Sequence, residues 1–296
     1  MSSLAIVGAG AIGSAIGWAA TEVGGKPTLC VRTGFDRLRI TKNDQTTEVP
    51  ACTVTDPAAV DPHDWVVVAT KAQDTAGIRG WLDRLVGPET VVVVVQNGIG
   101  QRDRVRPLVS DRTEILPSLI YQPAERIAPG EVELRGDGQI TVPAGPVGAR
   151  FAQVLAGSPV PVRQDEDFPT AAWRKLLNNV TANPITALTL RRLDVMTEPD
   201  IVELSRALLV EAVAVGTADG AHFEPDEVDL SMRAYLRHTA DPGGSSMLYD
   251  RLAGRPTEHE FITGAVVALG ARYGIPTPTN QVLLALLRGL NGSTQV

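Results

Sequence analysis

Four short runs of apolar residues near the start of the chain restrict the possible folds more than any other feature. They are LAIVGA (residues 4–9), PTLCVR (27–32), WVVVAT (65–70) and TVVVVVQ (90–96). The runs are rich in β-branched residues and lack the alternation of a strand with one exposed face, so each predicts a strand buried on both faces. Because helical stretches separate them, we expect βαβ units that build a parallel sheet.

Further along, two more strand segments precede a change to helical patterns. Strands are expected at TEILPSLIY (113–121) and EVELRGDGQITV (131–142), and the Gly-Asp-Gly of the second segment is typical of a hairpin turn. Apolar residues at helical spacing then predict helices at 198–220 and 279–290.

Another helix is predicted at 257–274, where Thr257 and Glu260 have the spacing of a capping box. The chain therefore has a strand-rich half followed by an all-helical half, with a boundary near residue 165. Its length of 296 residues fits two domains.

Composition excludes several classes of protein. The net charge of −7 argues against nucleic acid as a partner, because binding phosphates needs clustered lysines and arginines. No apolar run approaches the roughly 18 residues of a membrane span, and the sequence opens directly on an expected strand, so we expect a cytoplasmic protein that binds no membrane. Cys30 and Cys52 lack CxxC spacing and the four histidines fit no ligand pattern, so no metal is expected.

A glycine motif follows the first expected strand and opens the first expected helix. Gly8, Gly10 and Gly13 have G-x-G-x-x-G spacing, and Ala11 and Ile12 begin the helix. In a dinucleotide site the first glycine allows the tight turn and the second lets a pyrophosphate approach the backbone. The third lets helix and strand pack closely, while the helix N-terminus supplies free amides. The alternative is a glycine-rich turn that only packs.

The residues at the end of the second expected strand indicate which dinucleotide binds. NAD sites place an acidic residue there for the ribose 2′-hydroxyl. This chain has Arg32 and Thr33 there, and the first acidic residue after this strand is Asp36. Because an arginine suits a 2′-phosphate by charge and geometry, NADP(H) is favoured over NAD(H). The alternative for Arg32 is an exposed surface charge.

Lys71 and Asn97 each stand just past a predicted parallel strand, where open α/β sheets bind ligands. Gly98 and Gly100 would also permit a close approach to the backbone. Each residue alone could be an ordinary loop lysine or turn asparagine. Their shared location at two strand ends favours a ligand site.

The stretch AAWRKLLNNVTANPITAL (171–188) predicts a helix with an unusual polar row. Lys175, Asn179 and Asn183 are four residues apart, so they lie on one helical face. An amine followed by two amides suits a small polar oxyanion. The alternative is a helix that crosses a polar cleft between domains, and Asn178 lies off the row.

Three more polar residues need an explanation. Ser246 and Glu258 lie far along the chain, and Glu258 could simply complement a helix dipole. Glu211 stands inside the apolar LLVEAVAV, where an unpaired buried carboxylate is costly, and the sequence offers it no partner.

Together these residues resemble the ketopantoate reductase family over nearly the full chain. The family pattern has an N-terminal glycine fingerprint, a lysine and an Asn-Gly at strand ends, then W-R-K-L-x-x-N-x-x-x-N-P-x-T-A-L, S-S-M-x-x-D and T-E. This sequence carries them in order, at Gly8/Gly10/Gly13, Lys71, Asn97-Gly98, 173–188, 245–250 and Thr257-Glu258.

The resemblance implies an α/β fold in which a Rossmann-type, NADP-binding domain (1–165) precedes an all-helical substrate domain (166–296). It further implies NADPH-dependent reduction of ketopantoate, a small 2-oxo acid, to pantoate in pantothenate synthesis, at an active site in the cleft. By the same resemblance Lys175 is the general acid, and Glu258, a second catalytic residue, contacts the substrate together with Ser246.

Asn179 and Asn183 would bind the polar groups of the substrate, and Lys71 and Asn97 would lie beside the nicotinamide. A homodimer is possible. Arg191 and Arg192 depart from the small or polar residues common in the family, and could change which acid is recognised. Two alternatives therefore stay open: reduction of another small 2-oxo acid, or a redox sensor that binds NADP(H) without turnover.

Overall fold

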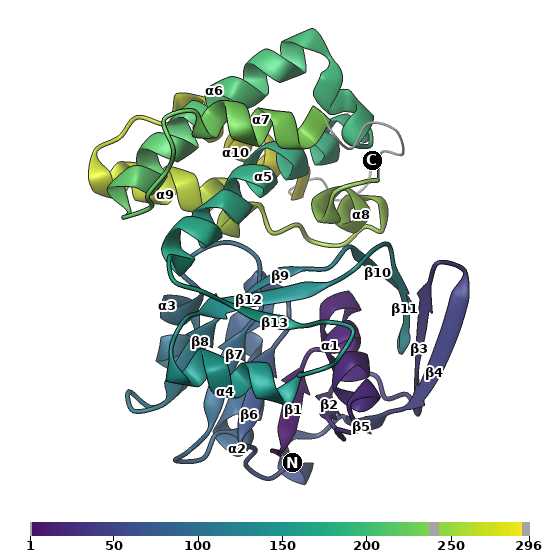
Figure 1. Cartoon of the computed structure of the whole chain (residues 1–296). Helices are drawn as coiled ribbons and strands as arrows, with labels where there is room; N and C mark the ends of the chain where they lie inside the picture. Colours follow the sequence, from purple (N-terminus) through teal and green to yellow (C-terminus); the bar gives the residue numbers. More distant parts are fainter. Residues whose placement is uncertain (1, 237–242, 292–296) are drawn as a thin grey trace. The chain divides into compact units, whose positions relative to one another are not determined.

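The computed structural model describes residues 2–236 and 243–291 (Figure 1). The chain divides into two compact units. The first comprises Met1–Gln96 and Gly100–Phe168, and the second comprises Asn97–Ile99 and Pro169–Val296. The division thus follows Phe168, a few residues beyond the predicted boundary, and the three-residue segment Asn97–Ile99, just after the run of five valines, groups with the helical unit.

A six-stranded parallel sheet forms the centre of the first unit, in the order β5-β2-β1-β6-β7-β8. The strands are β1 (Leu4–Val7), β2 (Thr28–Cys30), β5 (Cys52–Val54), β6 (Trp65–Val68), β7 (Val91–Val94) and β8 (Glu114–Pro117). The four apolar runs supply β1, β2, β6 and β7, which confirms that prediction. The order reverses beside β1, and this reversal is the switch point at which doubly wound sheets bind dinucleotides.

Side chains of the central strands alternate between two cores, which explains why the runs are apolar throughout. On one face Trp65 and Val67 of β6 belong to a core that includes α1 (Ala11–Glu22) and α4 (Pro146–Val154). On the other face Val66 and Val68 pack with α2 (Arg79–Leu85) and α3 (Gln101–Val105). Short 3-10 helices lie in the connections: η1 (Pro57–Ala59), η2 (Ala72–Ile78) and η3 (Arg106–Leu108).

The first unit also contains two smaller sheets, ordered β10-β11-β3-β4 and β13-β12-β9. Their strands are β3 (Arg37–Lys42), β4 (Gln45–Pro50), β9 (Leu119–Tyr121), β10 (Ala124–Ala128), β11 (Glu131–Leu134), β12 (Gln139–Pro143) and β13 (Val162–Asp165). The β3–β4 hairpin turns at Asn43 and Asp44, whose φ angles of 49° and 61° are ones that asparagine and aspartate tolerate in a tight turn.

Two strand predictions were wrong in detail. The segment 113–121 divides at Ser118 into β8 and β9, which belong to different sheets. The segment 131–142 is not a hairpin, because β11 pairs with β10 and β3 while β12 pairs with β9 and β13. The amide of Gln122 donates to the Gly136 carbonyl (3.2 Å), and a Cβ on Gly138 would lie 1.8 Å from Gln122 Oε1. The Gln122 side chain therefore packs against the linker, which crosses between the two sheets.

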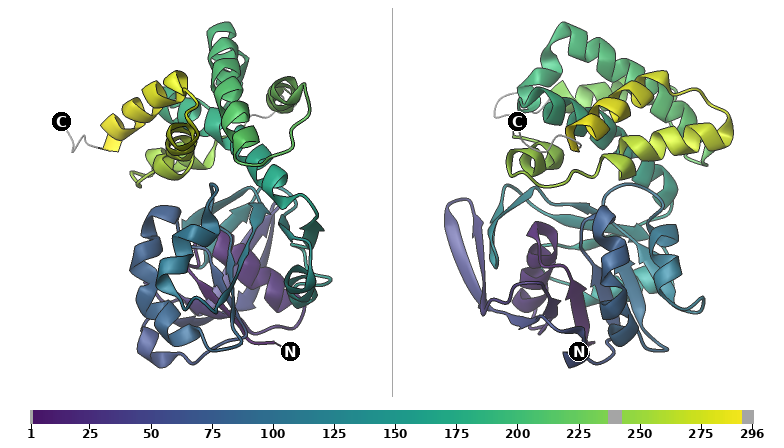
Figure 2. Two further views of the ribbon diagram at one scale, coloured as in Figure 1. Left: turned by 90° about the vertical axis from the view of Figure 1, so that its left-hand side faces the viewer. Right: turned by 180° about the vertical axis from the view of Figure 1, so that it is seen from behind.

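In the described part of the second unit every regular element is helical, as predicted (Figure 2). The α-helices are α5 (Phe168–Thr189), α6 (Pro199–Ala218), α7 (Glu227–Leu236), α8 (Ser246–Leu252), α9 (Thr263–Tyr273) and α10 (Pro278–Asn291), with 3-10 helices η4 (Leu193–Thr197) and η5 (His259–Phe261). Trp173 and Leu177 of α5 share a core with Ala212 and Val215 of α6. Over the described ranges, no helix is long and apolar enough to cross a membrane.

The helix predicted at 257–274 begins later than expected, at Thr263. The Thr257 hydroxyl bonds to His259 Nδ1 (2.8 Å) rather than to a helix amide. The Glu260 carboxylate is held by the guanidinium of Arg288 at 2.5 and 2.8 Å. Because both side chains have other partners, the expected capping box does not form.

Glu211 has the partner that the sequence did not reveal. Its carboxylate accepts hydrogen bonds from the backbone N–H of Thr279 (2.8 Å) and of Asn280 (3.0 Å), and from Asn280 Nδ2 (2.8 Å). These amides lie in the first turn of α10, where helix N–H groups lack partners within the helix and the dipole favours an anion. Glu211 therefore joins α6 to α10 and is a structural residue.

Candidate active site

The glycine turn after β1 has the shape that its sequence predicts. Gly8 has a φ of +95°, and a Cβ there would lie 2.7 Å from Thr70 Cγ2. A Cβ on Gly13 would lie 2.0 Å from the Gly8 carbonyl oxygen, so only glycine lets α1 approach the turn. A Cβ on Gly10 would meet no atom within 4 Å. The open side of the turn is thus at Gly10, where a phosphate could contact the backbone.

The first turn of α1 fits an anionic group. Gly10 is its N-cap residue, no side chain caps it, and no acidic residue lies in its first turn. The leading N–H groups, including those of Ala11 and Ile12, have no acceptor within the helix, and they form the positive end of the helix dipole. The turn can therefore take a pyrophosphate, as the sequence predicts for a dinucleotide.

Arg32 lies two residues after β2 and is exposed. Within the described residues its guanidinium makes no hydrogen bond or ion pair. No acidic residue stands at the end of β2, because Thr33 and Gly34 follow directly. The side chain is therefore available for a 2′-phosphate, and this role stays a prediction.

Gln96 is a site residue that the sequence analysis missed. It is buried at the end of β7, and its Nε2 donates to the hydroxyls of Thr75 (2.9 Å) and Thr70 (3.2 Å) and to the carbonyl of Lys71 (3.3 Å). Arg104 donates to its Oε1 (3.0 Å). One amide thus ties the loop that carries Lys71 to the end of β7. A glutamine that ends a run of five valines is the only sequence signal for this role.

In the second unit, Asn97 joins the two ionisable residues that the sequence singled out. Lys175 Nζ donates to Asn97 Oδ1 (3.2 Å), and Asn97 Nδ2 donates to Glu258 Oε2 (3.1 Å). Gly98 follows with a φ of +84°, and a Cβ there would lie 2.2 Å from the Phe261 carbonyl oxygen. The glycine is thus required for Asn97 to lie beside η5, next to Glu258.

The surroundings of Lys175 make its ammonium easier to deprotonate. Burial lowers the pKa of Lys175 from 10.5 to about 8, and the Glu258 carboxylate opposes part of that decrease. Glu258 is itself buried, at 4 % exposed. An ammonium with a pKa near neutrality can donate a proton, and the amine can then be reprotonated from solvent. This is the property required of a general acid.

The two amides beyond Lys175 on α5 differ in their surroundings. Asn183 is 4 % exposed, and its Nδ2 has no hydrogen-bond partner among the described residues. Leaving such a buried donor unpaired costs about 1–3 kcal/mol, and a ligand oxygen would remove that cost. Asn179 is half-buried. Ser246 begins α8 with an exposed side chain, and is not hydrogen bonded to Asn97, Lys175 or Glu258.

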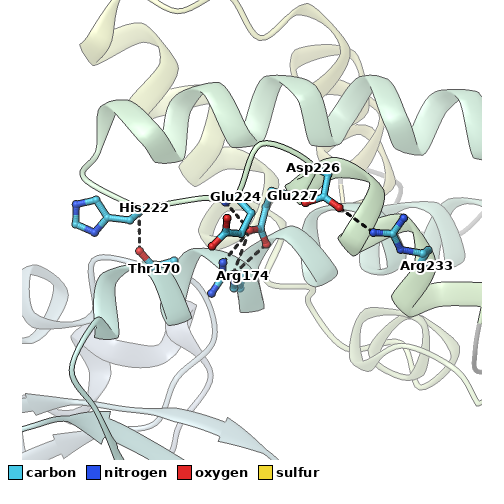
Figure 3. A network of polar contacts seen from close by, with 7 residues as sticks. All are labelled: Thr170, Arg174, His222, Glu224, Asp226, Glu227 and Arg233. Carbon is cyan, nitrogen blue, oxygen red and sulfur yellow. Dashed lines mark hydrogen bonds and ion pairs between the residues drawn. The ribbon is translucent and has the colours of Figure 1, made fainter.

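A polar network that includes Arg174 and Glu227 holds α5 and α7 together (Figure 3). Arg174 Nε contacts both oxygens of Glu227 (3.0 and 3.2 Å), and its Nη2 adds a bond of 2.9 Å. The Glu227 side chain is 5 % exposed, so the pair is desolvated on one side. Figure 3 also shows the neighbouring contacts of Thr170 with His222, of Glu224 with Glu227 and of Asp226 with Arg233.

Arg191, which departs from the family pattern, has local acidic partners. It bonds to Asp194 (2.6 Å) and Glu198 (2.8 Å), and all three side chains are well exposed. These two ion pairs balance its charge on the surface. Over the described ranges, no three His, Cys, Asp or Glu side chains gather where they could hold a metal ion.

Comparison with known proteins identifies the relatives of this chain. The family model for ketopantoate reductase PanE/ApbA matches residues 4–146, and the model for its C-terminal region matches residues 167–291. The chain is 38 % identical to the 2-dehydropantoate 2-reductase of Caulobacter vibrioides over 97 % of its length and 98 % of the relative. It is 36 % identical to that of Mycobacterium tuberculosis, over 97 % of both chains.

The fold is also similar to solved structures. A PanE/ApbA family ketopantoate reductase from Ralstonia eutropha superposes with a TM-score of 0.89 at 28 % identity, covering 98 % of both chains. This agreement confirms the predicted order of a Rossmann-type domain and a helical domain.

Proposed function

Because this chain belongs to the ketopantoate reductase family, we propose that it reduces 2-dehydropantoate to pantoate with NADPH, as a step of pantothenate biosynthesis. The observation that carries the proposal is the hydrogen-bonded set of Lys175, Asn97 and Glu258. The family shares a dinucleotide-dependent oxidoreductase reaction, and this set supplies the proton that such a reduction needs.

NADPH, when bound, supplies the hydride that reduces the carbonyl carbon. We assign the turn of Gly8, Gly10 and Gly13 and the first amides of α1 to its pyrophosphate. The exposed Arg32, without an acidic neighbour on β2, favours a 2′-phosphate over a free ribose. Lys71 and Asn97 are assigned to the nicotinamide end, and the amide of Gln96 holds the Lys71 loop in place.

Lys175 is the general acid of the proposed mechanism. When C2 of the oxo acid accepts a hydride, its carbonyl oxygen gains a negative charge, which an ammonium stabilises and then protonates. Asn97 holds Lys175 Nζ at 3.2 Å and so limits its orientation. Glu258 raises the proton affinity of the lysine, which keeps enough of it charged at neutral pH.

The substrate is assigned to the polar groups that remain. The unpaired Asn183 amide and the half-buried Asn179 follow Lys175 along one face of α5. Together with the Ser246 hydroxyl they can donate hydrogen bonds to a carboxylate and to a hydroxyl group, which are the two polar ends of ketopantoate.

The test is a turnover screen with purified protein. NADPH and NADH oxidation would be followed with ketopantoate, with 2-oxoisovalerate, which lacks the hydroxymethyl group, and with pyruvate. We expect the highest kcat/KM for NADPH with ketopantoate.

A higher kcat/KM for another acid would assign a different substrate to the same chemistry. Folded protein that binds NADPH, yet oxidises it with none of the acids, would contradict the enzyme proposal and favour a redox sensor.

A further inference from the structure

Two buried hydroxyl groups join α5 to the start of α8. Thr186 Oγ1 and Ser245 Oγ are 2.6 Å apart, and the two residues are 0 % and 8 % exposed. Ser245 is the N-cap residue of α8 and also accepts a bond from the backbone N–H of Leu248 (3.1 Å). The pair therefore connects the last turn of α5 to the first turn of α8.

The direction of these bonds follows from their other partners. The Thr186 hydroxyl can donate only once, and the Ala182 carbonyl lies 2.6 Å away as its acceptor. Thr186 Oγ1 must then accept from Ser245, whose oxygen in turn accepts from Leu248. Each hydroxyl thus donates once and accepts once, and removing either one leaves the other without its buried partner.

Additional contacts hold the same segment against α5. Arg251 of α8 donates to the carbonyls of Ala187 and Leu188 at the end of α5. The N–H of Leu193, the first residue of η4, donates to the Gly243 carbonyl (3.0 Å). The segment from Gly243 to α8 is therefore held by both α5 and η4, and the Thr186–Ser245 bond involves the residue next to Ser246.

Each member of the pair has a neighbour in the chain that is assigned to the substrate. Ser246 is bonded directly to Ser245 in the chain, and Asn183 lies one turn before Thr186 on α5. We propose that Thr186 and Ser245 are positioning residues, which set the Ser246 hydroxyl relative to the Asn183 amide and so determine how well the oxo acid fits. This inference rests on the proposed function, because it takes Ser246 as a substrate contact.

Kinetics of matched variants test the proposal. Thr186→Val keeps the shape of the side chain and removes the hydroxyl, and Thr186→Ser keeps the hydroxyl. Thr186→Val should raise KM for ketopantoate roughly three- to tenfold, the effect of one hydrogen bond, with kcat and NADPH affinity within about twofold. Thr186→Ser should restore the wild-type KM. Ser245→Ala provides the same test from the other helix if Thr186→Val does not fold.

Thr181→Val is the matched control, because Thr181 is also fully buried on α5 and donates to the carbonyls of its own helix. It should leave KM unchanged even if the melting temperature falls. In a Ser246→Ala background, Thr186→Val should raise KM no further, since the group that it positions is gone.

The possible failures are distinguishable. A wild-type KM in Thr186→Val, combined with a raised KM in Ser246→Ala, would overturn the positioning role and leave the proposed function intact. An additive effect in the double variant would make the pair purely structural. An unchanged KM in Ser246→Ala itself would remove the substrate contact, and with it the basis of this inference.

Discussion

Replacing Lys175 with methionine should have opposite effects on stability and on activity. Methionine has a similar length and no charge. The decrease of the Lys175 pKa from 10.5 to about 8 means that burial disfavours the charged form by about 3 kcal/mol. Because the residue is only half-buried, we expect a smaller realised cost, about 1–3 kcal/mol. Lys175→Met should therefore raise the free energy of unfolding at pH 7 by about that amount.

The pH dependence has a definite sign. Between pH 8 and 10.5 the unfolded chain binds more protons at this lysine than the folded chain, so the wild type gains stability as pH rises through this window. Below pH 8 the full cost of burying the ammonium is present. The stability difference between Lys175→Met and the wild type should therefore shrink from pH 8 to 10.5.

Lys175→Met should lower the activity of the enzyme although it raises its stability. Without the proton donor, kcat for ketopantoate reduction should fall by about 10²–10⁴-fold, while NADPH binding survives. In the wild type the rate should decline above pH 8 as the ammonium loses its proton, and the variant should lack that decline.

Denaturant titrations at several pH values and kcat against pH at saturating NADPH measure both effects. Lys26→Met, at an exposed lysine, is the control and should change neither. A folded, NADPH-binding Lys175→Met enzyme with near wild-type kcat would refute the assignment, and Lys71 would then be the next candidate acid.

Four further variants test the remaining assignments. Arg32→Ala should raise KM for NADPH by about 10- to 100-fold, the loss of charge-assisted bonds to a phosphate, with little change for NADH; equal use of both cofactors by the wild type would contradict this. Asn179→Ala and Ser246→Ala should each raise KM for ketopantoate by about 5- to 100-fold without weakening NADPH binding, as equilibrium titration can check. Gln96→Leu should lower the melting temperature and weaken NADPH binding, because Arg104 loses a partner and the loop after β6 loses its tie; unchanged NADPH affinity would make Gln96 purely structural.

The parallel sheet could be predicted from the sequence because burial on both faces leaves a strong signal. The hairpin at 131–142 could not be excluded, since a Gly-Asp-Gly linker is compatible with either a turn or a crossing. In the fold the linker contacts Gln122, whose side chain occupies the space beside Gly138. A contact of this kind joins residues that are neighbours only in the folded chain, so no pattern in the sequence predicts it.

The sequence predicted part of the candidate site, where a residue's spacing or its place at a strand end leaves a pattern. Lys175 stands out through helical spacing, and Asn97 through its place at a strand end. The bond between them links residues far apart in the chain, and only the fold reveals it. Glu211 seemed unpaired because its partners are backbone amides of α10, and no sequence pattern singles out Thr186, whose partner Ser245 lies far along the chain.

The most direct test of the central claim is where the hydride goes. Ketopantoate would be reduced with NADPH that carries deuterium at C4 of the nicotinamide, using each of the two C4 stereoisomers in turn, and the product would be analysed by mass spectrometry. We expect pantoate with one deuterium at C2 from one stereoisomer and none from the other, at one pantoate per NADPH oxidised. NADPH oxidation that yields no pantoate, or pantoate without deuterium from either stereoisomer, would contradict the account.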